Sequence, residues 1–321
     1  MHAAVVRSFD RPPRYESFDD PQVSGDDEVI VDVLAVGLHP RVRSGASGGH
    51  YTSEGRLPLV PGVDGVGRLP DGQRVYFVAP DDAIGTMAER TVIDQRRSVV
   101  VPDSVDSVIA AAAINPAMSS WVALRRRVAF KPGQRVLILG ATGNAGQMAV
   151  QVAKHLGAAH VVAVGRNQGR LDGLPSLGAD VVVSLADDPD EAAIRVGEAA
   201  SEVDVVIDYL WGPPAEQVML PLLRNRSDRS RLLSWIQIGA VAGPSVNLPS
   251  VALRSANLIV LGSGQGSVTS AGILAELPAL LDELARGTFV VNAVAVPLAE
   301  VEDAWLAPVD PGVRLVFTPT T

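Results

Sequence analysis

Three glycines spaced three residues apart form the part of this sequence with the clearest chemical meaning. They lie in one run that follows a continuous apolar segment and opens a predicted helix over residues 147–156: Gly140-Ala141-Thr142-Gly143-Asn144-Ala145-Gly146. A turn without Cβ atoms lets a phosphate approach the backbone N–H groups at a helix N-terminus. We therefore expect this run to bind the pyrophosphate of a dinucleotide. The alternative is a tight strand–helix turn without a ligand.

The end of the next predicted strand carries the charge that selects the cofactor. An NAD enzyme usually has Asp or Glu there, about 20 residues after the glycines, to hold the ribose hydroxyls. This sequence has Gly165-Arg166-Asn167, with Arg170 close behind and no carboxylate. A guanidinium binds a 2′-phosphate through two hydrogen bonds and stacks on adenine. We expect Arg166 and Asn167 to contact NADPH rather than NADH; the alternative is a solvated surface arginine.

These residues need a parallel sheet to bring them together. Apolar runs typical of strands buried on both faces recur at residues 136–139, 161–164, 181–183, 205–207, 232–238 and 258–261. Helical stretches separate these runs. Six parallel strands with intervening helices predict a doubly wound, Rossmann-type α/β domain.

The rest of the chain has a different texture. Residues 29–36, 72–78 and 89–93 read as short strands separated by Pro- and Gly-rich turns, which predicts an irregular β domain. Ser104 is the expected cap of a first helix, and a second is expected to follow Pro116 and run through Leu124. Residues 272–321 predict a helix and short strands that return to the first domain.

Composition excludes several classes of function. The 321 residues carry 27 Lys and Arg against 36 Asp and Glu, a formal net charge of −9. This argues against nucleic acid or an anionic membrane as a partner, because phosphate binding needs clustered cations. The absence of cysteine excludes disulfides, Fe–S clusters, thiol catalysis and cysteine-ligated zinc. The N-terminus shows no targeting signal and residues 108–114 are too short to span a bilayer, so we expect a cytoplasmic protein.

Further motifs resemble those of one enzyme family. The sequence has Arg43-Ser44-Gly45, then Tyr51, then a segment that reads Leu57-Pro58-Leu59-Val60-Pro61-Gly62-Val63-Asp64-Gly65-Val66-Gly67. Residues 112–117, residues 131–136 before the glycine turn, and Leu177-Gly178-Ala179-Asp180 add to the pattern. Together they resemble the medium-chain dehydrogenase/reductase superfamily, and most closely its zinc-independent quinone oxidoreductase branch, over nearly the whole chain.

This resemblance implies an α/β protein with a GroES-like β domain, a Rossmann domain and a cleft between them. We expect the GroES-like domain over residues 1–118, the Rossmann domain over 119–265, and a segment over 266–321 that returns to the first domain. A homodimer is also implied. Zinc members of the superfamily bind a catalytic metal; here His39, His50 and Asp64 are available by type, but their spacing fits no usual triad, so we expect no metal.

Without a Lewis acid, a conjugated acceptor is easier to reduce than a simple ketone. Hydride added to an enal, an enone or a quinone spreads charge into an oxyanion that one or two hydrogen-bond donors stabilise. Tyr51 is the first candidate donor, since the resemblance implies a tyrosine there; the alternative is a packing residue. His39 stands where the branch usually has Asn, and it is either a second donor or a structural histidine.

Other residues are cofactor candidates by their position along the chain. Asn115 and Ser119 lie where the chain crosses into the Rossmann domain, and Tyr209 follows the fourth strand. Gly239 ends the fifth strand, and Gly262 and Ser263 end the sixth, where the resemblance implies contact with the nicotinamide carboxamide. Ordinary packing is the alternative for each.

The sequence favours an NADPH-dependent reductase of quinones or α,β-unsaturated carbonyl compounds. A non-catalytic NADPH-binding protein is a second interpretation. A biosynthetic enoyl-thioester reductase is a third, and it would need a basic entry such as Arg41 and Arg43, or Arg125-Arg126-Arg127.

Overall fold

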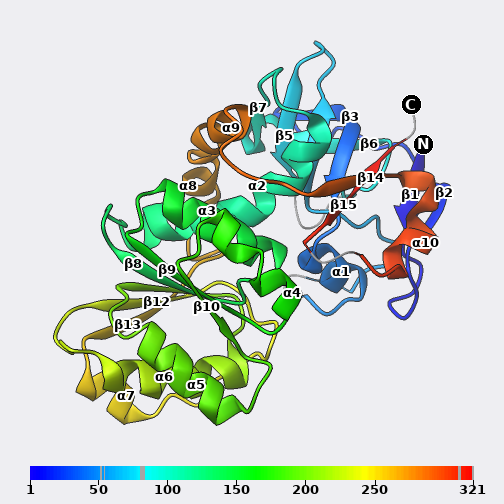
Figure 1. Cartoon of the computed structure of the whole chain (residues 1–321). Coiled ribbons are helices and arrows are strands. Elements are labelled where there is room, and N and C mark those ends of the chain that lie inside the picture. Colours follow the sequence, from blue (N-terminus) through cyan, green and yellow to red (C-terminus); the bar gives the residue numbers. More distant parts are fainter. Residues whose placement is uncertain (51–52, 54, 80–83, 310–311, 320–321) are drawn as a thin grey trace. The chain divides into compact units, whose positions relative to one another are not determined.

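A computed structural model describes residues 1–50, 53, 55–79, 84–309 and 312–319 (Figure 1). The chain forms two compact units. Unit 1 comprises Met1–Asn115 and Leu277–Thr321, and unit 2 comprises Pro116–Glu276. The domain boundaries expected from the sequence, after residues 118 and 265, stay a prediction about where separate domains begin and end.

Unit 2 contains a six-stranded parallel sheet in the order β10-β9-β8-β11-β12-β13. Its strands, in chain order, are β8 (Arg135–Leu139), β9 (His160–Gly165), β10 (Val181–Ser184), β11 (Val205–Asp208), β12 (Leu233–Gln237) and β13 (Leu258–Gly262). Taken in chain order this is the Rossmann arrangement, with the order reversing between β8 and β11. The six strands and the fold class expected from the apolar runs are confirmed.

Helices cover both faces of this sheet (Figure 1). Side chains of α5 (Pro189–Ala199), α6 (Gly212–Asn225) and α7 (Ser250–Ser255) form one buried cluster with the strands. On the opposite face lies α3 (Asn144–His155). The short helices α4 (Gln168–Leu171), η3 (Leu174–Leu177) and α8 (Ser270–Leu274) complete the unit. Burial on both faces explains why the central strands read as unbroken apolar runs.

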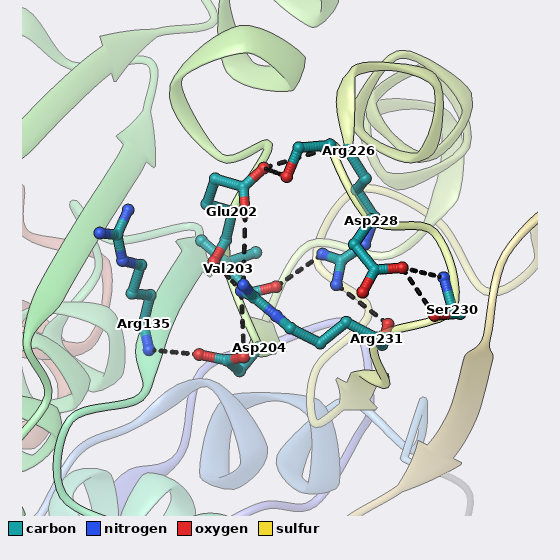
Figure 2. A network of polar contacts seen from close by, with 9 residues as sticks. Arg135, Glu202, Val203, Asp204, Arg226, Asp228, Ser230 and Arg231 are labelled. Carbon is teal, nitrogen blue, oxygen red and sulfur yellow. Dashed lines mark hydrogen bonds and ion pairs between the residues drawn. The ribbon is translucent and has the colours of Figure 1, made fainter.

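A polar network closes the amino ends of the sheet (Figure 2). The backbone N–H of Arg135 donates to Asp204 Oδ2 over 2.8 Å, and Arg231 Nη2 lies 3.1 Å from Asp204 Oδ1. Buried Arg226 donates from Nη1 to the carbonyl of Val203 over 2.7 Å. This network fixes the starts of β8, β11 and β12 at the edge opposite to the glycine turn.

Unit 1 is built on antiparallel strands. A small sheet pairs β1 (His2–Val5) with β2 (Arg14–Ser17). The larger sheet has the order β14-β15-β3-β4-β5-β7, and β6 (Arg90–Asp94) also pairs with β3. Its strands are β3 (Glu28–Gly37), β4 (Asp64–Arg68), β5 (Arg74–Val78), β7 (Ser98–Val100), β14 (Ala293–Pro297) and β15 (Arg314–Thr318). The C-terminal segment enters this sheet through β15, which pairs antiparallel with β3.

Short helices complete unit 1. They are α1 (Pro40–Ala46), η1 (Gln95–Arg97), α9 (Leu277–Ala285), η4 (Leu298–Glu300) and α10 (Val301–Leu306). The core gathers side chains from β1, β3, β5, η4 and β15. The C-terminal residues are therefore part of the same hydrophobic core as the first strands.

One helix replaces the two that the sequence predicts around residue 116. Helix α2 runs through Ser107–Val122 with Pro116 inside it, and continues as the π-helical turn η2 (Ala123–Arg127). Asp106, not Ser104, caps it, since its Oδ1 accepts from Val108 N and Ile109 N over 2.8 and 3.1 Å. Proline costs the helix one hydrogen bond, and burial of the alanines before it outweighs that loss.

The same helix qualifies the sequence argument about membrane spans. Residues 107–127 form 21 helical residues, long and apolar enough to cross a bilayer by length and composition. Two thirds of the most apolar stretch is buried within the protein. That degree of burial is typical of a core helix.

Candidate dinucleotide and catalytic sites

The glycine turn lies between β8 and α3, as the sequence predicts. Gly140 follows the last residue of β8 with φ at +87°, a conformation that favours glycine. Gly143 is the N-cap of α3, with φ at −77°, and no side chain caps the helix. The first N–H groups of a twelve-residue helix therefore point out of the turn with only backbone around them.

The three glycines have different reasons to be glycine. A Cβ on Gly146 would lie 2.2 Å from the carbonyl oxygen of Gly140, which the fold cannot accommodate. A Cβ on Gly143 would lie 3.6 Å from that same oxygen, an ordinary contact, and would otherwise enter open space. Gly140 and Gly146 thus serve the turn itself, while Gly143 leaves a space beside the helix N-terminus.

The carboxyl end of β9 adjoins this turn. Gly165 lies against Thr142, so close that a Cβ there would be 2.5 Å from Thr142 Cγ2. Arg166 is exposed and makes no hydrogen bond or ion pair with the described residues. Asn167 caps α4, because its side-chain oxygen accepts from the backbone N–H of Arg170 over 3.0 Å. Asn167 therefore holds local structure, and Arg166 is the exposed cation beside the turn.

Arg170 is the residue that the sequence analysis noticed but did not include in the site. Its Nη1 donates to the carbonyl oxygen of Thr142 over 2.8 Å. Its Nε is buried and has no partner among the described residues, and burial lowers the pKa of this guanidinium. A cation is thus fastened directly to the phosphate-binding turn. The signal was its position four residues after Arg166 on a short helix.

The predicted cofactor residues at the end of β11 contact one another. The hydroxyls of Ser119 and Tyr209 lie 2.7 Å apart, and burial raises the pKa of Tyr209 to about 12. Gly239 packs so closely on Tyr209 that a Cβ would lie 2.8 Å from its carbonyl oxygen. The structure therefore brings these three together at the carboxyl edge of the sheet, where ligands bind in such folds.

Asp208 holds the backbone at that edge. It accepts hydrogen bonds from Leu210 N, Trp211 N and Trp235 Nε1 over 2.8–2.9 Å. Burial of Asp208 outweighs these hydrogen bonds, and its pKa is raised. Trp211 has φ at +52°, a strained value for a residue other than glycine. This carboxylate is the group that holds the strained turn after β11.

The last cofactor candidates follow β13. The carbonyl oxygen of Gly262 accepts from Arg127 Nε over 2.8 Å, and the backbone N–H of Ser263 donates to Gln237 O over 2.9 Å. Nothing lies within 4 Å of the place where a Cβ on Gly262 would stand. That backbone is accessible, and its role towards a nicotinamide stays a prediction.

The arginine run after Trp121 is engaged within unit 2. Arg125 Nε and Arg126 Nε each lie 2.5 Å from a carboxylate oxygen of Glu276, which also accepts from Trp121 Nε1 over 3.1 Å. Arg127 donates to the carbonyls of Gly262 and Ser267. These arginines hold the 262–276 segment.

Asp64 is the centre of a buried polar cluster in unit 1. His39 Nε2 lies 3.2 Å from Asp64 Oδ1. Tyr76 donates from its hydroxyl to Asp64 Oδ2 over 2.6 Å, and Asn115 Nδ2 donates to the same oxygen over 2.8 Å. Asp64 is 2% exposed and His39 is 5% exposed. We call these four residues the Asp64 cluster.

Three elements bring the Asp64 cluster together. Asp64 begins β4, Tyr76 lies opposite on β5, and His39 is the N-cap of α1 just after β3. Gly37 lets β3 approach α2, because a Cβ there would lie 2.6 Å from the carbonyl oxygen of Ala111. Asn115, one turn further along α2, thereby reaches the carboxylate.

The cluster favours an ionised Asp64. Burial opposes ionisation, but the charge and hydrogen bond of His39, with the hydrogen bonds from Tyr76 and Asn115, outweigh it and hold the pKa of Asp64 below its ordinary value. Burial and then the charge of Asp64 raise the pKa of Tyr76 well above its ordinary value. Burial lowers the pKa of Arg314 to about 10, against the opposing charge of Asp64.

Two predicted residues need separate mention. Tyr51, the first candidate donor, lies outside the described residues. Asn115, predicted to touch the cofactor, instead donates to Asp64, so its role towards a ligand stays a prediction. Sequence reasoning considered Asp64 as a metal ligand and missed it as a hydrogen-bond centre. Tyr76 was missed altogether, since it reads as one more apolar residue of a strand.

The ligands for zinc do not assemble. Among the described residues, no group of three or more His, Cys, Asp or Glu side chains could hold a metal ion. The two candidates that do meet, His39 and Asp64, bond to each other. The donor set therefore does not fit a catalytic zinc, which needs three protein ligands and usually thiolate or imidazole donors.

Comparison with known proteins places this geometry in a family. A family model described as zinc-binding dehydrogenase matches residues 145–285. A probable NADPH-dependent quinone reductase (tdiC) of Emericella nidulans is 30% identical, over 99% of this chain and 100% of that protein. The chloroplastic NADPH-dependent alkenal/one oxidoreductase of Arabidopsis thaliana is 27% identical, over 58% of this chain and 50% of that one.

A solved structure matches over the full length. The quinone oxidoreductase from Thermus thermophilus, whose title includes its complex with NADPH, has a TM-score of 0.75 and is 26% identical over 99% of this chain and 100% of that one. The full-length relative, the sheet order and the glycine turn agree. The chain belongs to the quinone oxidoreductase type of the medium-chain dehydrogenase/reductase superfamily.

Proposed function

We propose that this protein is an NADPH-dependent oxidoreductase that transfers a hydride to a quinone or an α,β-unsaturated carbonyl compound. The observation that carries the proposal is the glycine turn with its two arginines. Gly143 leaves space for a pyrophosphate at the N-terminus of α3, and Arg166 and Arg170 stand where an NAD enzyme has a carboxylate. When bound, NADPH supplies the hydride.

The residues present fit that cofactor. The pyrophosphate needs uncapped N–H groups and no Cβ in its way, which α3 and Gly143 provide. The 2′-phosphate needs a cation without a carboxylate partner, and Arg170 has a buried Nε without a partner among the described residues. The other candidates, Ser119, Tyr209 and Gly239, lie at the carboxyl edge of the same sheet.

The substrate class follows from the charge that develops when the hydride arrives. A simple ketone becomes an alkoxide and needs a strong electrophile, whereas a quinone or an enone spreads the charge over conjugated atoms. Hydrogen-bond donors on this chain, His39 or Tyr51, suffice for the second case. We therefore propose a zinc-independent reaction, supported by the absence of cysteine and by the pairing of His39 with Asp64.

A homodimer and a cytoplasmic location complete the proposal. Strand β13 is an edge strand of the parallel sheet, and its Ile259 is 49% exposed. An apolar edge strand is a ready surface for pairing with a second copy. Light scattering after gel filtration tests the dimer, with a mass of about 67 kDa expected from two chains of 33.6 kDa.

The enoyl-thioester alternative gains no specific support from the structure. Arg125, Arg126 and Arg127 are engaged by Glu276 and by backbone carbonyls. Arg43 donates to the carbonyl of Trp305 and stacks 5.4 Å from its ring centroid. A relative named trans-enoyl reductase pgmF, from Aspergillus terreus, is 26% identical over 68% of this chain, so this reaction stays the alternative.

The test is the loss of NADPH absorbance at 340 nm with four acceptors: a 2-alkenal, an enone, a quinone and a simple ketone. We expect turnover of the conjugated acceptors and none of the ketone, with no effect of a chelator. Metal analysis of the purified protein accompanies the assay. Turnover of the ketone that a chelator abolishes would overturn the zinc-independent reaction, and NADPH binding without any turnover would favour a non-catalytic protein.

A further inference from the structure

The Asp64 cluster holds a histidine by one ring nitrogen. Nε2 of His39 faces the carboxylate of Asp64 at 3.2 Å. Nδ1 makes no hydrogen bond within the described part of the chain, and the residue keeps 5% of its surface exposed. A ring anchored on one side by a carboxylate and open on the other is the arrangement by which proteins orient a histidine for proton transfer.

We propose that His39 protonates the reduced acceptor, and that Asp64, Tyr76 and Asn115 are positioning residues that fix its ring. This inference rests on the proposed function, since it concerns the acid of the same reaction. It goes beyond the family resemblance, because the branch usually has Asn at the position of His39.

The hydrogen bonds of Asp64 explain why the carboxylate holds one orientation. Oδ1 is used by His39, and Oδ2 is used by both Tyr76 and Asn115. Thr86 adds a fourth restraint, because its hydroxyl donates to the backbone carbonyl of Asp64 over 2.8 Å. With both oxygens occupied, rotation of the carboxylate would break at least two hydrogen bonds.

The charges around the cluster favour a protonated His39 beside an ionised Asp64. The charge of His39 helps to hold the pKa of Asp64 low, and the attraction between the pair is mutual. Arg314, on β15, is the other cation whose charge reaches Asp64. Arg41, on α1, acts on Tyr76 and favours its ionised form, but burial and Asp64 prevail and keep the phenol protonated.

The proposed step is balanced in atoms and electrons. A hydride adds to the β-carbon of an enone, the C=C pair moves to form the enolate, and negative charge collects on the carbonyl oxygen. That oxygen takes the proton from Nδ1 of the imidazolium, and the N–H electron pair stays on the nitrogen. His39 is left neutral, with its remaining proton on Nε2 and held by Asp64. Solvent then restores the Nδ1 proton.

The first experiment reads the ring directly and needs no turnover. The chain has five histidines, so ¹⁵N-resolved spectra can assign His39 by comparison with His39→Asn. We expect one state in the wild type, with hydrogen on Nε2 at every pH, and mixed tautomers in Asp64→Asn at neutral pH. Thr86→Val is the matched control, since it removes a hydrogen bond to the Asp64 backbone and leaves the carboxylate untouched.

The second experiment measures turnover of an enone against pH. We expect His39→Asn to lose roughly 10²- to 10⁴-fold in kcat, the range for a general acid, and Asp64→Asn at least about tenfold, as for carboxylates that orient working histidines. The wild-type rate should fall as pH rises, because neutral His39 has no proton on Nδ1, and His39→Asn should lack this dependence. Tyr76→Phe should fall between Asp64→Asn and Thr86→Val.

The outcomes separate this inference from the proposed function. Wild-type turnover with unchanged pH dependence in His39→Asn would overturn the inference and leave the reductase standing. A single tautomer in Asp64→Asn would overturn the role of Asp64. Cofactor fluorescence checks that NADPH still binds to each variant, and thermal unfolding checks that each is folded. If Thr86→Val reproduced the altered pH profile, the cluster would be structural and the inference wrong.

Discussion

Arg170 donates a hydrogen bond from Nη1 to the carbonyl oxygen of Thr142 over 2.8 Å, across a separation of 28 residues. The contact fixes a guanidinium beside the glycine turn before any ligand arrives. A positive charge held in place costs less to order on binding than a free surface arginine. The structure therefore adds Arg170 to Arg166 as a residue that we expect to distinguish NADPH from NADH.

We expect Arg170→Ala and Arg166→Ala each to weaken NADPH binding at least about tenfold, because each removes a charge-assisted hydrogen bond to the 2′-phosphate. NADH, which lacks that phosphate, should bind nearly as before. Fluorescence titration with both cofactors measures the difference. Equal weakening of NADPH and NADH would mean that the arginines hold the turn and do not read the phosphate.

The two glycines that flank the N-terminus of α3 should respond differently to the same substitution. Gly143→Ala places its Cβ in open space with an acceptable φ, so the protein should keep its melting temperature and lose NADPH affinity. Gly146→Ala places its Cβ 2.2 Å from the carbonyl of Gly140, so it should lower the melting temperature as well. Calorimetry and cofactor titration on both variants test this contrast.

A Gly143→Ala variant that binds NADPH as tightly as the wild type would remove the pyrophosphate from this turn. Gly72→Ala is the baseline for glycine loss on the surface of unit 1, away from the turn. Its φ of +91° means that some loss of stability is expected there without any effect on the cofactor.

The sheet of unit 2 could be predicted strand by strand because strands buried on both faces leave unbroken apolar runs in the sequence. The run Val136-Leu137-Ile138-Leu139 has no polar residue, and all four side chains are fully buried. The same burial made the bounds of α2 hard to predict. Pro116 predicts a helix start by local rules, and the tertiary packing of the surrounding alanines overrides it.

The candidate sites were predictable to different depths. The glycine turn is local in sequence, so its residues could be named before the structure. The Asp64 cluster is not local: His39, Asp64, Tyr76 and Asn115 come from four elements, and the pairing of β4 with β5 brings Asp64 and Tyr76 together. Without that register, His39 could be suspected as a donor, but its partner could not be identified.

Glu276 should contribute to the stability of unit 2 through its three donors. Glu276→Gln removes the charge that pairs with Arg125 and Arg126, and we expect a loss of about 1–3 kcal/mol in the free energy of unfolding. The lower part of that range is favoured because both arginines are about half exposed and solvent screens them. Urea unfolding at neutral pH measures the difference.

The same carboxylate sets a pH dependence with a definite sign. Burial opposes the ionisation of Glu276, but the hydrogen bonds from Arg125, Trp121 and Arg126 prevail and lower its pKa from 4.5. A lowered pKa gives stability that is present above pH 4.5 and is lost as the pH falls below it. The gap between the wild type and Glu276→Gln should therefore narrow in acid; a constant gap would contradict the assignment.

Tyr209 should govern the alkaline limit of stability in unit 2. Burial raises its pKa from 10.0 to about 12 in the folded protein. A group whose pKa is raised on folding stabilises the protein fully below the unfolded pKa, and that stability is lost as the pH rises from 10 to 12. Two units of pKa correspond to about 3 kcal/mol, so the melting temperature should fall steeply in this window.

Two variants isolate the contribution of Tyr209 from that of other groups. Tyr209→Phe removes the ionising group, and its melting temperature should depend less on pH between 10 and 12. Ser119→Ala keeps the phenol but removes a hydrogen bond that lowers its pKa, so the alkaline loss should move to higher pH. Absorbance of the phenolate at 295 nm follows the ionisation directly. Because Tyr76 is also buried and its pKa is raised further, Tyr76→Phe should leave the part of the loss that belongs to Tyr209 unchanged; if both variants shift it alike, the two phenols titrate together with global unfolding, and the Ser119 contact does not set the limit.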